Sequence, residues 1–236
     1  MRFTRAPVCE ACLEHLERLR PAAECSRCGA PFENELPLHG TGLCGLCRRG
    51  VTDFAWGRGF GLYDGTLRHL IHLLKYDGMR PLALPLARRL VPLLAEAGPV
   101  DLIVPVPLDG RRERHRGFNQ AALVAAEVSR LSGIPIEKGA LRRIRATEMQ
   151  TGLTDRQRRL NVRGAFHVRR PEVIAGRNIA LIDDVITTGA TASACALTLE
   201  RAGASRVVVL ALARARRRIV DVPVTAVAAR AAVAGA

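Results

Sequence analysis

Aromatic side chains are scarce in this sequence. Phe, Trp and Tyr make up 4% of its 236 residues, whereas hydrophobic residues together make up 48%. The chain can therefore form a substantial core, but that core must be aliphatic, built from Leu, Val, Ala and Ile. At this length we expect one α/β domain with a small appendage.

Long hydrophobic runs are also missing. No window reaches the roughly 18 apolar residues that a membrane span requires. The basic N-terminus, MRFTRAPVCEAC, is not followed by the apolar stretch of a signal peptide. The apolar stretch 219–236 is interrupted by Asp221, Pro223 and Arg230. These absences predict a cytoplasmic protein without a membrane span.

Acidic residues are few compared with basic ones. The chain has 36 Lys and Arg against 22 Asp and Glu, which gives a formal net charge of +14. This charge predicts attraction to polyanions, namely nucleic acid, phosphorylated metabolites or anionic lipid, without choosing among them. For any single cluster of arginines, a solvated basic surface is the alternative. The clusters lie at residues 111–116, 142–145, 156–163 and 214–218.

Six of the seven cysteines form CxxC pairs near the N-terminus, which indicates metal binding in a reducing compartment. A CxxC turn directs two thiolates at one point, and two such turns complete a tetrahedral site. CSRCGAPF and GLCGLC thus predict a zinc ribbon whose ligands are Cys25, Cys28, Cys44 and Cys47. An iron–sulfur cluster is the main alternative. Residues 1–50 have few apolar runs, so metal would stabilise them.

The third pair, Cys9 and Cys12, has no partner pair of cysteines. His15 could complete a site with it, and His39 lies between the other pairs, although each histidine is as readily explained as a surface residue. Cys9 and Cys12 therefore remain candidate ligands without an assigned partner. Cys195 has the spacing of a core residue and is given no chemical role.

From about Asp53 the sequence predicts alternating strands and helices. FAWGRGFGLY is typical of a strand interrupted by glycines. The next segment predicts a helix that ends at Lys75, and a second helix is expected over residues 82–95. The first helix is indicated by apolar residues at helical spacing, Leu67, Leu70, Ile71 and Leu74.

Two later segments share one pattern: a short apolar strand, a polar loop and a helix of small residues. The strands are residues 102–104 and 179–182, and the loop after the first strand is the basic segment 108–120. Alternation of this kind predicts an open, mainly parallel α/β sheet covered by helices on both faces. Such sheets bind ligands beyond the carboxyl ends of their strands, so we expect both loops to lie at one site.

The segment IALIDDVITTGAT, residues 179–191, predicts a ligand with two kinds of group. Amides at the helix start and the threonine hydroxyls would receive a phosphate, and Gly189 lets the backbone approach it. Asp183 and Asp184, expected at the end of the strand, would repel a phosphate. They would instead bind sugar hydroxyls or a bridging Mg²⁺. A phosphorylated sugar has both kinds of group.

The same segment resembles the phosphoribosyl-pyrophosphate (PRPP) motif of type I phosphoribosyltransferases over eleven consecutive positions, LIDDVITTGAT. Helix capping by threonine is the alternative, and it explains one threonine only. CxxC pairs, LKYDG, VPVPLDGRRERHRGFNQA and RATEMQTGLTDRQRRLNVRGAF precede the motif. Together they resemble the ComF family over nearly the whole chain up to about Arg214.

This resemblance implies a zinc ribbon over residues 1–50 and a phosphoribosyltransferase domain over residues 51–214. The tail, residues 215–236, lies beyond the match, and we expect it to be poorly ordered. Members of the family carry a further CxxC pair near the start, so Cys9 and Cys12 resemble half of a first ribbon that is truncated or decayed.

The resemblance also implies roles for residues. Asp183 and Asp184 would face the ribose hydroxyls, directly or through Mg²⁺. Arg112 and Arg116 would contact the pyrophosphate, with a solvated basic turn as the alternative. Lys75 is explained either by the helix dipole or by a pyrophosphate contact. The 5-phosphate would be held by Thr187, Thr188, Gly189, Ala190 and Thr191. A mobile hood over the sugar would include Thr147, Gln150, Leu153, Arg158 and Asn161.

Three functions remain open at this point. The first is a magnesium-dependent phosphoribosyltransferase whose acceptor the sequence does not specify. The second is an accessory protein that binds single-stranded nucleic acid, against which the scarcity of aromatic residues counts. The third is a regulator that senses PRPP. The resemblance further implies a link to natural transformation, with single-stranded DNA and a competence helicase as partners.

Overall fold

The structure is a computed structural model. It describes Val8, Cys9, Cys12, Leu16 and residues 21–32, 41–145 and 155–216. Several predictions fall outside these residues: those for His15, His39, Thr147, Gln150, Leu153 and residues 217–236. Among the described helices, none is long and apolar enough to cross a membrane.

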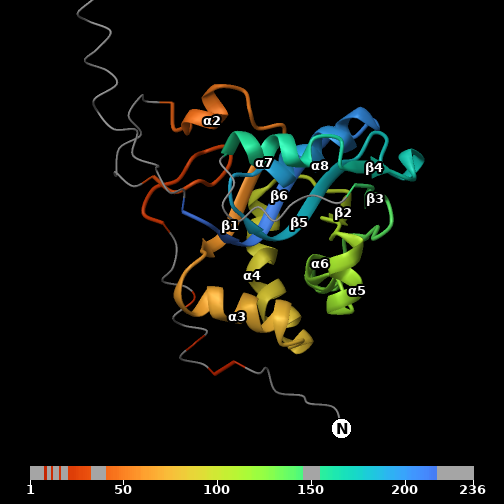
Figure 1. The fold of residues 1–236 in the computed structure, drawn as a ribbon. Coiled ribbons are helices and arrows are strands. Elements are labelled where there is room, and N and C mark those ends of the chain that lie inside the picture. Colours follow the sequence, from red (N-terminus) through yellow and green to blue (C-terminus); the bar gives the residue numbers. More distant parts are fainter. Residues whose placement is uncertain are drawn as a thin grey trace, which may run out of the picture.

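Four parallel strands form the central sheet in the order β1-β6-β5-β2 (Figure 1). Their carboxyl ends therefore lie along one edge. A short antiparallel pair, β3 (Leu141–Arg143) with β4 (Phe166–Val168), forms a second sheet. The predicted fold class, an open and mainly parallel α/β sheet, is confirmed. The central strands are β1 (Trp56–Leu62), β2 (Leu102–Pro105), β5 (Asn178–Ile186) and β6 (Arg206–Arg214).

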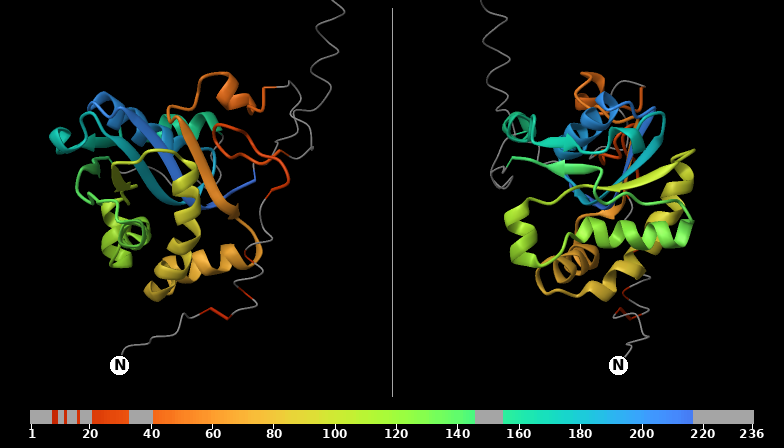
Figure 2. Two further views of the ribbon diagram at one scale, coloured as in Figure 1. Left: turned by 180° about the vertical axis from the view of Figure 1, so that it is seen from behind. Right: turned by 90° about the vertical axis from the view of Figure 1, so that its right-hand side faces the viewer.

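Helices cover both faces of this sheet (Figures 1 and 2). Along β5, Ala180 and Ile182 pack in one buried cluster, and Ile179 and Leu181 pack in the other. A strand buried on both faces must be apolar at every position, which explains the continuous apolar run in the sequence. One face carries α3 (Gly65–Tyr76), α4 (Ala83–Glu96) and α6 (Gln120–Ser132). The other carries α7 (Asp155–Val162) and α8 (Ala190–Arg201). Single 3₁₀ turns lie at Arg80–Leu82 and Pro171–Val173.

The segment after β2 is not wholly a loop, as the sequence suggested. Seven of its residues form a helix, α5 (Gly110–Arg116). The Asp109 carboxylate caps this helix by accepting hydrogen bonds from the amides of Arg111 and Arg112, at 3.1 and 3.4 Å. Gly117 ends it in the left-handed conformation, at φ 79°. Capping at both ends compensates for the lack of an apolar face.

Strand β5 also runs further than expected. It continues past Ile182 to Ile186 because it stays paired with β6 up to Arg214. Asp183 and Asp184 consequently belong to the last part of the strand and do not follow it. They keep the alternation of the strand, so their side chains leave opposite faces of the backbone.

The cysteine-rich segment packs onto the same core. It contains the short helix α2 (Gly45–Arg48). Cys25, Cys28, Cys44 and Cys47 belong to one buried cluster with residues of β5, β6 and α8. In Figure 1, α2 lies beside α7 and α8, on the side of the sheet opposite α3 and α4.

Candidate functional site

A cavity of about 1040 Å³ lies at the carboxyl ends of β2 and β5. Three parts of the chain form most of its wall, and Tyr63 and Arg143 also line it. The end of α3 contributes Lys75 and Tyr76, the segment after β2 contributes residues from within 106–120, and the end of β5 with the start of α8 contributes residues 183–187 and 189–192. The two loops that the sequence placed at one site therefore line one cavity.

Residues 187–191, which we call the β5–α8 turn, lie at this cavity. Gly189 has φ 83°, a left-handed conformation that suits glycine. Thr188 is not among the residues that line the cavity, and its Oγ1 accepts a hydrogen bond from the Ala190 amide at 3.3 Å. Phe54 packs against the turn, since a Cβ on Gly189 would lie 3.7 Å from its ring. The turn residues that line the cavity are Thr187, Gly189, Ala190 and Thr191.

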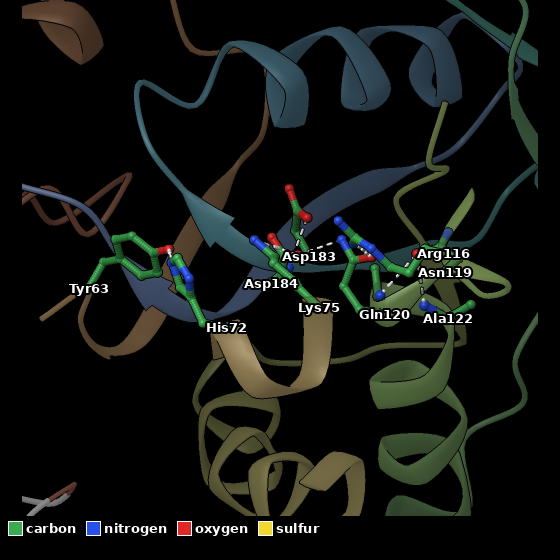
Figure 3. A network of polar contacts seen from close by, with 10 residues as sticks. Tyr63, His72, Lys75, Arg116, Asn119, Gln120, Ala122, Asp183 and Asp184 are labelled. Atoms are coloured by element: carbon green, nitrogen blue, oxygen red, sulfur yellow. Dashed lines mark hydrogen bonds and ion pairs between the residues drawn. The ribbon is translucent and has the colours of Figure 1, made fainter. Parts of the chain in front are cut away.

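Asp184 is the centre of a polar network that joins three helices to the end of β5 (Figure 3). Its Oδ2 lies 2.9 Å from Nζ of Lys75 at the end of α3. The same oxygen accepts a hydrogen bond from the Gln120 side chain at the start of α6. Arg116 in turn donates to Oε1 of Gln120. The network fixes α3, α5 and α6 relative to the end of β5.

The neighbouring Asp183 is in a different electrostatic situation. Burial and the Asp184 carboxylate raise the pKa of Asp183 from 3.8 to about 7, although the Asp184 amide donates to its Oδ1 at 2.8 Å. Burial works to lower the pKa of Lys75, but the attraction of Asp184 and Asp183 outweighs it, and that pKa is raised. Near neutral pH, Asp183 can therefore take up or release a proton while Lys75 stays charged.

Basic side chains of α5 lie along the cavity. Arg112 is exposed and Arg116 is partly exposed, and both line the cavity. The Arg116 guanidinium stacks over the Tyr76 ring, with 5.2 Å from Cζ to the ring centroid. Because Tyr76 is 68% exposed, this arginine is held at the mouth of the cavity and not buried beneath it.

Sequence reasoning missed some residues of this site. Asn119 caps α6 by accepting from the amides of Ala121 and Ala122, and its Nδ2 donates to the carbonyl of Val106 at 3.0 Å. It thereby ties the segment after β2 to α6. The Asn directly before an apolar helix is a capping signal that could have indicated this role. The contact of Gln120 with Asp184 spans 64 positions in the chain and has no local signal.

Four of the seven cysteines form a second candidate site, a metal site. The Sγ atoms of Cys25, Cys28, Cys44 and Cys47 all lie within 4.8 Å of one another, and all four residues are buried. Tetrahedral zinc with Zn–S bonds of about 2.3 Å requires sulfur atoms about 3.8 Å apart. The Cys28 and Cys44 sulfurs are 3.6 Å apart. The four-cysteine cluster therefore fits zinc.

The other sequence-predicted residues lie elsewhere. The thiols of Cys9 and Cys12 hydrogen-bond with each other and are not part of the four-cysteine cluster. Cys195 is buried in the core, as expected. Of the predicted hood, Arg158 and Asn161 lie on α7, outside the residues that line the cavity.

Comparison with known proteins gives the family. No protein-family model matches the chain. It is 33% identical over 208 residues to DNA utilization protein YhgH of Salmonella typhimurium, covering 85% of this chain and 87% of that protein. It is also 33% identical over 145 residues to Competence protein F of Haemophilus influenzae, covering 61% and 58% of the two chains. The chain belongs to the ComF family. This ComF-family relationship confirms the resemblance that the motifs indicated.

Solved structures give a weaker likeness. The ComF-family chain is similar to glutamine PRPP amidotransferase from B. subtilis, with 22% identity and a TM-score of 0.37 over 55% of this chain and 26% of that one. Adenine phosphoribosyltransferase from Saccharomyces cerevisiae gives 16% identity and a TM-score of 0.35 over 59% and 72%. At these scores we infer nothing about ligand or activity from either structure.

Proposed function

We propose that the cavity binds PRPP together with Mg²⁺ and that the protein acts in the cytoplasm in DNA uptake during natural transformation. The observation that carries the proposal is the arrangement at the cavity. Two carboxylates at the end of β5, a hydroxyl-bearing turn at the start of α8 and the arginines of α5 line one space. A pentose with a phosphate at one end and a pyrophosphate at the other matches these three groups in kind.

Each group has a distinct part in this proposal. The β5–α8 turn receives the 5-phosphate through its amides and hydroxyls at the amino end of α8. Asp183 and Asp184 bind the ribose diol, directly or through Mg²⁺, for which carboxylate oxygens are suitable ligands. Arg112 and Arg116 contact the pyrophosphate. The Lys75–Asp184 ion pair keeps the charge of Asp184 compensated before the ligand arrives.

The same groups would favour cleavage of the anomeric bond. Negative charge develops on the departing pyrophosphate, and cations placed around it stabilise that charge in the transition state. Bound Mg²⁺ would add to this stabilisation. We therefore propose a phosphoribosyltransferase activity, with an acceptor that the residues of the cavity do not specify.

The test is a calorimetric titration of the protein with PRPP in the presence of Mg²⁺. We expect saturable heat from the wild type and strongly weakened binding in Asp183→Asn and Asp184→Asn. Asp101→Asn is the matched control, because Asp101 lies at the opposite edge of the sheet, before β2, where an Asn oxygen can still accept from the Asn178 amide. If the wild type gives no heat, both the transferase and the PRPP sensor are excluded. Release of pyrophosphate with candidate acceptors then separates transferase from sensor.

Binding of single-stranded DNA is a second candidate. It is favoured by the exposed basic side chains of α5 and by the name of the relatives, DNA utilization protein. A gel shift at several salt concentrations, with Arg111→Glu/Arg114→Glu as the variant, tests it. Affinity that survives physiological salt and is lost in the variant supports the candidate, since purely non-specific attraction falls steeply with salt. A competence helicase is the partner that we would add to this assay.

A further inference from the structure

Arg214, the last residue of β6, joins the four-cysteine cluster to the β5–α8 turn. Its side chain is buried, with an exposed fraction of 2%. Nη1 donates to the backbone carbonyls of Ile186, at 2.8 Å, and of Thr187. Nη2 lies 3.7 Å from Sγ of Cys28, within hydrogen-bonding distance of a sulfur. One guanidinium thus contacts a candidate metal ligand and the backbone that enters the turn.

The buried guanidinium of Arg214 requires hydrogen-bond acceptors or negative charge close to it. A buried guanidinium is costly unless acceptors or negative charge compensate it. Two carbonyl oxygens supply acceptors, and a metal-bound thiolate supplies negative charge. Zinc with four thiolates carries a formal excess of two negative charges, and hydrogen bonds from outside donors are a regular means of stabilising such sites. Arg214 is placed to donate one to Cys28.

The packing around Arg214 reinforces this connection. The Arg27 carbonyl, between two of the cysteines, accepts from the Gly57 amide of β1 at 2.8 Å. A Cβ on Gly29 would lie 2.9 Å from the Gly57 carbonyl oxygen, so the two segments are in close contact. The Asp53 amide lies 3.3 Å from Oγ of Ser193 on α8. The cysteine segment is therefore held against β1, and the residue Asp53 that follows it is held against α8.

We propose that Arg214 is a positioning residue that couples zinc binding at the four-cysteine cluster to the shape of the β5–α8 turn. With zinc bound, Cys28 would be a thiolate that accepts a hydrogen bond from the Arg214 guanidinium. The guanidinium also donates to the carbonyls of Ile186 and Thr187 and so fixes the start of the turn. The turn is then formed before a ligand arrives, which lowers the cost of binding. That the turn binds phosphate rests on the proposed function, whereas the coupling itself does not.

The first experiment needs no ligand and compares zinc-loaded wild type with Arg214→Gln and Arg214→Lys. Zinc affinity is measured by competition with a chelator, and hydrogen exchange is followed at the amides of residues 187–191. We expect Arg214→Gln to lower zinc affinity roughly 10–100-fold, the usual effect of removing an outside donor. We expect the turn amides to exchange faster and the α6 amides to be unchanged. Arg214→Lys, which keeps a cationic donor, should recover part of both effects.

Arg206→Gln is the matched control. Arg206 is the first residue of β6, and its Nη1 donates to the Ala97 carbonyl at 2.7 Å, far from the turn along the same strand. It should leave zinc affinity and turn exchange unchanged. If Arg214→Gln alters only zinc affinity, or only turn exchange, the two sites are not coupled through this residue and the proposal is overturned. Unchanged values for both readouts overturn it as well.

The second experiment measures the coupling in the presence of ligand. PRPP with Mg²⁺ should tighten zinc binding to the wild type by roughly fivefold or more, because coupling between sites is reciprocal. The absorption of the cobalt-substituted cluster should shift on the same titration. Both effects should vanish in Arg214→Gln and persist in Arg206→Gln. If the wild type binds no PRPP, the proposed function fails, while the exchange experiment still decides the role of Arg214. If PRPP binds without changing zinc affinity, the coupling fails and the proposed function stands.

Discussion

Asp183, one of the two adjacent aspartates at the end of β5, has a pKa that is raised toward neutrality. Burial and the Asp184 carboxylate raise the pKa of Asp183 to about 7. A diol or a magnesium ion favours the ionised carboxylate, so PRPP affinity should rise as the pH increases from 6 to 8. Asp183→Asn should bind weakly at every pH and lose this dependence. Calorimetry at a series of pH values measures it.

Asp183 also affects folding stability, which should fall as the pH rises, whereas PRPP affinity should rise. An acid whose pKa is raised on folding destabilises the folded state above its unfolded pKa, and the cost grows from about pH 4 until the folded pKa is passed near 7. Asp183→Asn removes this cost. Its melting temperature should therefore exceed that of the wild type, and by more at pH 8 than at pH 5. An equal difference at both pH values would show that Asp183 is not the titrating group.

The Lys75–Asp184 pair gives a second prediction at this scale. Both side chains are largely buried, with exposed fractions of 14% and 8%. Asp184→Asn leaves the lysine charge uncompensated and should lower the free energy of unfolding by about 3 kcal/mol. This value is at the lower end of the usual cost of removing one partner from a buried ion pair, because Asp183 also attracts Lys75 and compensates part of its charge.

Lys75→Met/Asp184→Asn is the control for this pair. The double variant removes both charges and should be more stable than Asp184→Asn alone, as measured by urea unfolding. If the unfolding free energy lost in the double variant equals the sum of the losses in Lys75→Met and Asp184→Asn, the two side chains act independently and the buried ion pair is not a stabilising unit.

Residues of the site could be predicted from sequence where a local motif contains them. The aspartates, the threonines and Gly189 lie within eleven consecutive positions, and all of them except Thr188 line the cavity. The partner of Lys75 could not be predicted, because its contact with Asp184 joins α3 to β5. The contact of Arg214 with Cys28 could not be predicted for the same reason, since the two residues lie 186 positions apart in the chain.

At the scale of elements, the β5–α8 turn depends on one backbone conformation. Gly189 has φ 83°, and alanine in this region costs about 1–2 kcal/mol. Gly189→Ala should lower stability by about this amount and weaken PRPP binding roughly tenfold, as the turn relaxes away from its ligand-ready shape. Calorimetry and urea unfolding of the same preparation measure the two effects.

Gly133→Ala is the matched variant for this prediction. Gly133 ends α6 at φ 75°, and a Cβ there would contact nothing within 4 Å. It should show the loss of stability without the loss of affinity. Equal losses of affinity in both variants would mean that general destabilisation, and not the shape of the turn, controls binding.

Elements were predictable where hydrophobic periodicity was present. The strands and the long helices follow from apolar patterns, because burial on a sheet imposes them. Helix α5 has no apolar face, so periodicity could not find it, and only Asp109 at its start and Gly117 at its end indicate a helix. The extension of β5 depends on pairing with β6, which local sequence does not encode.

At the scale of the whole molecule, the strand order and the position of the cysteine segment lay beyond the reach of the sequence. The CxxC spacing predicted four residues that the structure brings together, because each turn is local. It did not predict that they would share a buried cluster with β5, β6 and α8. The sequence predicts a domain boundary between residues 50 and 51. The four cysteines precede that boundary, and they pack against residues of the sheet that follow it.

This shared core leads to a prediction for unfolding. If the cysteine segment and the sheet form one cooperative unit, removing zinc with a strong chelator should lower the melting temperature by roughly 10 °C or more while calorimetry still shows a single transition. Cys44→Ser, which removes one ligand, should behave like the chelated wild type. Cys195→Ala is the control, because Cys195 lies in the same buried cluster but outside the four-cysteine cluster, and it should keep the zinc content of the wild type. Two separate transitions, of which only the first responds to the chelator, would instead mean that the cysteine segment unfolds by itself and that the sheet does not depend on its metal.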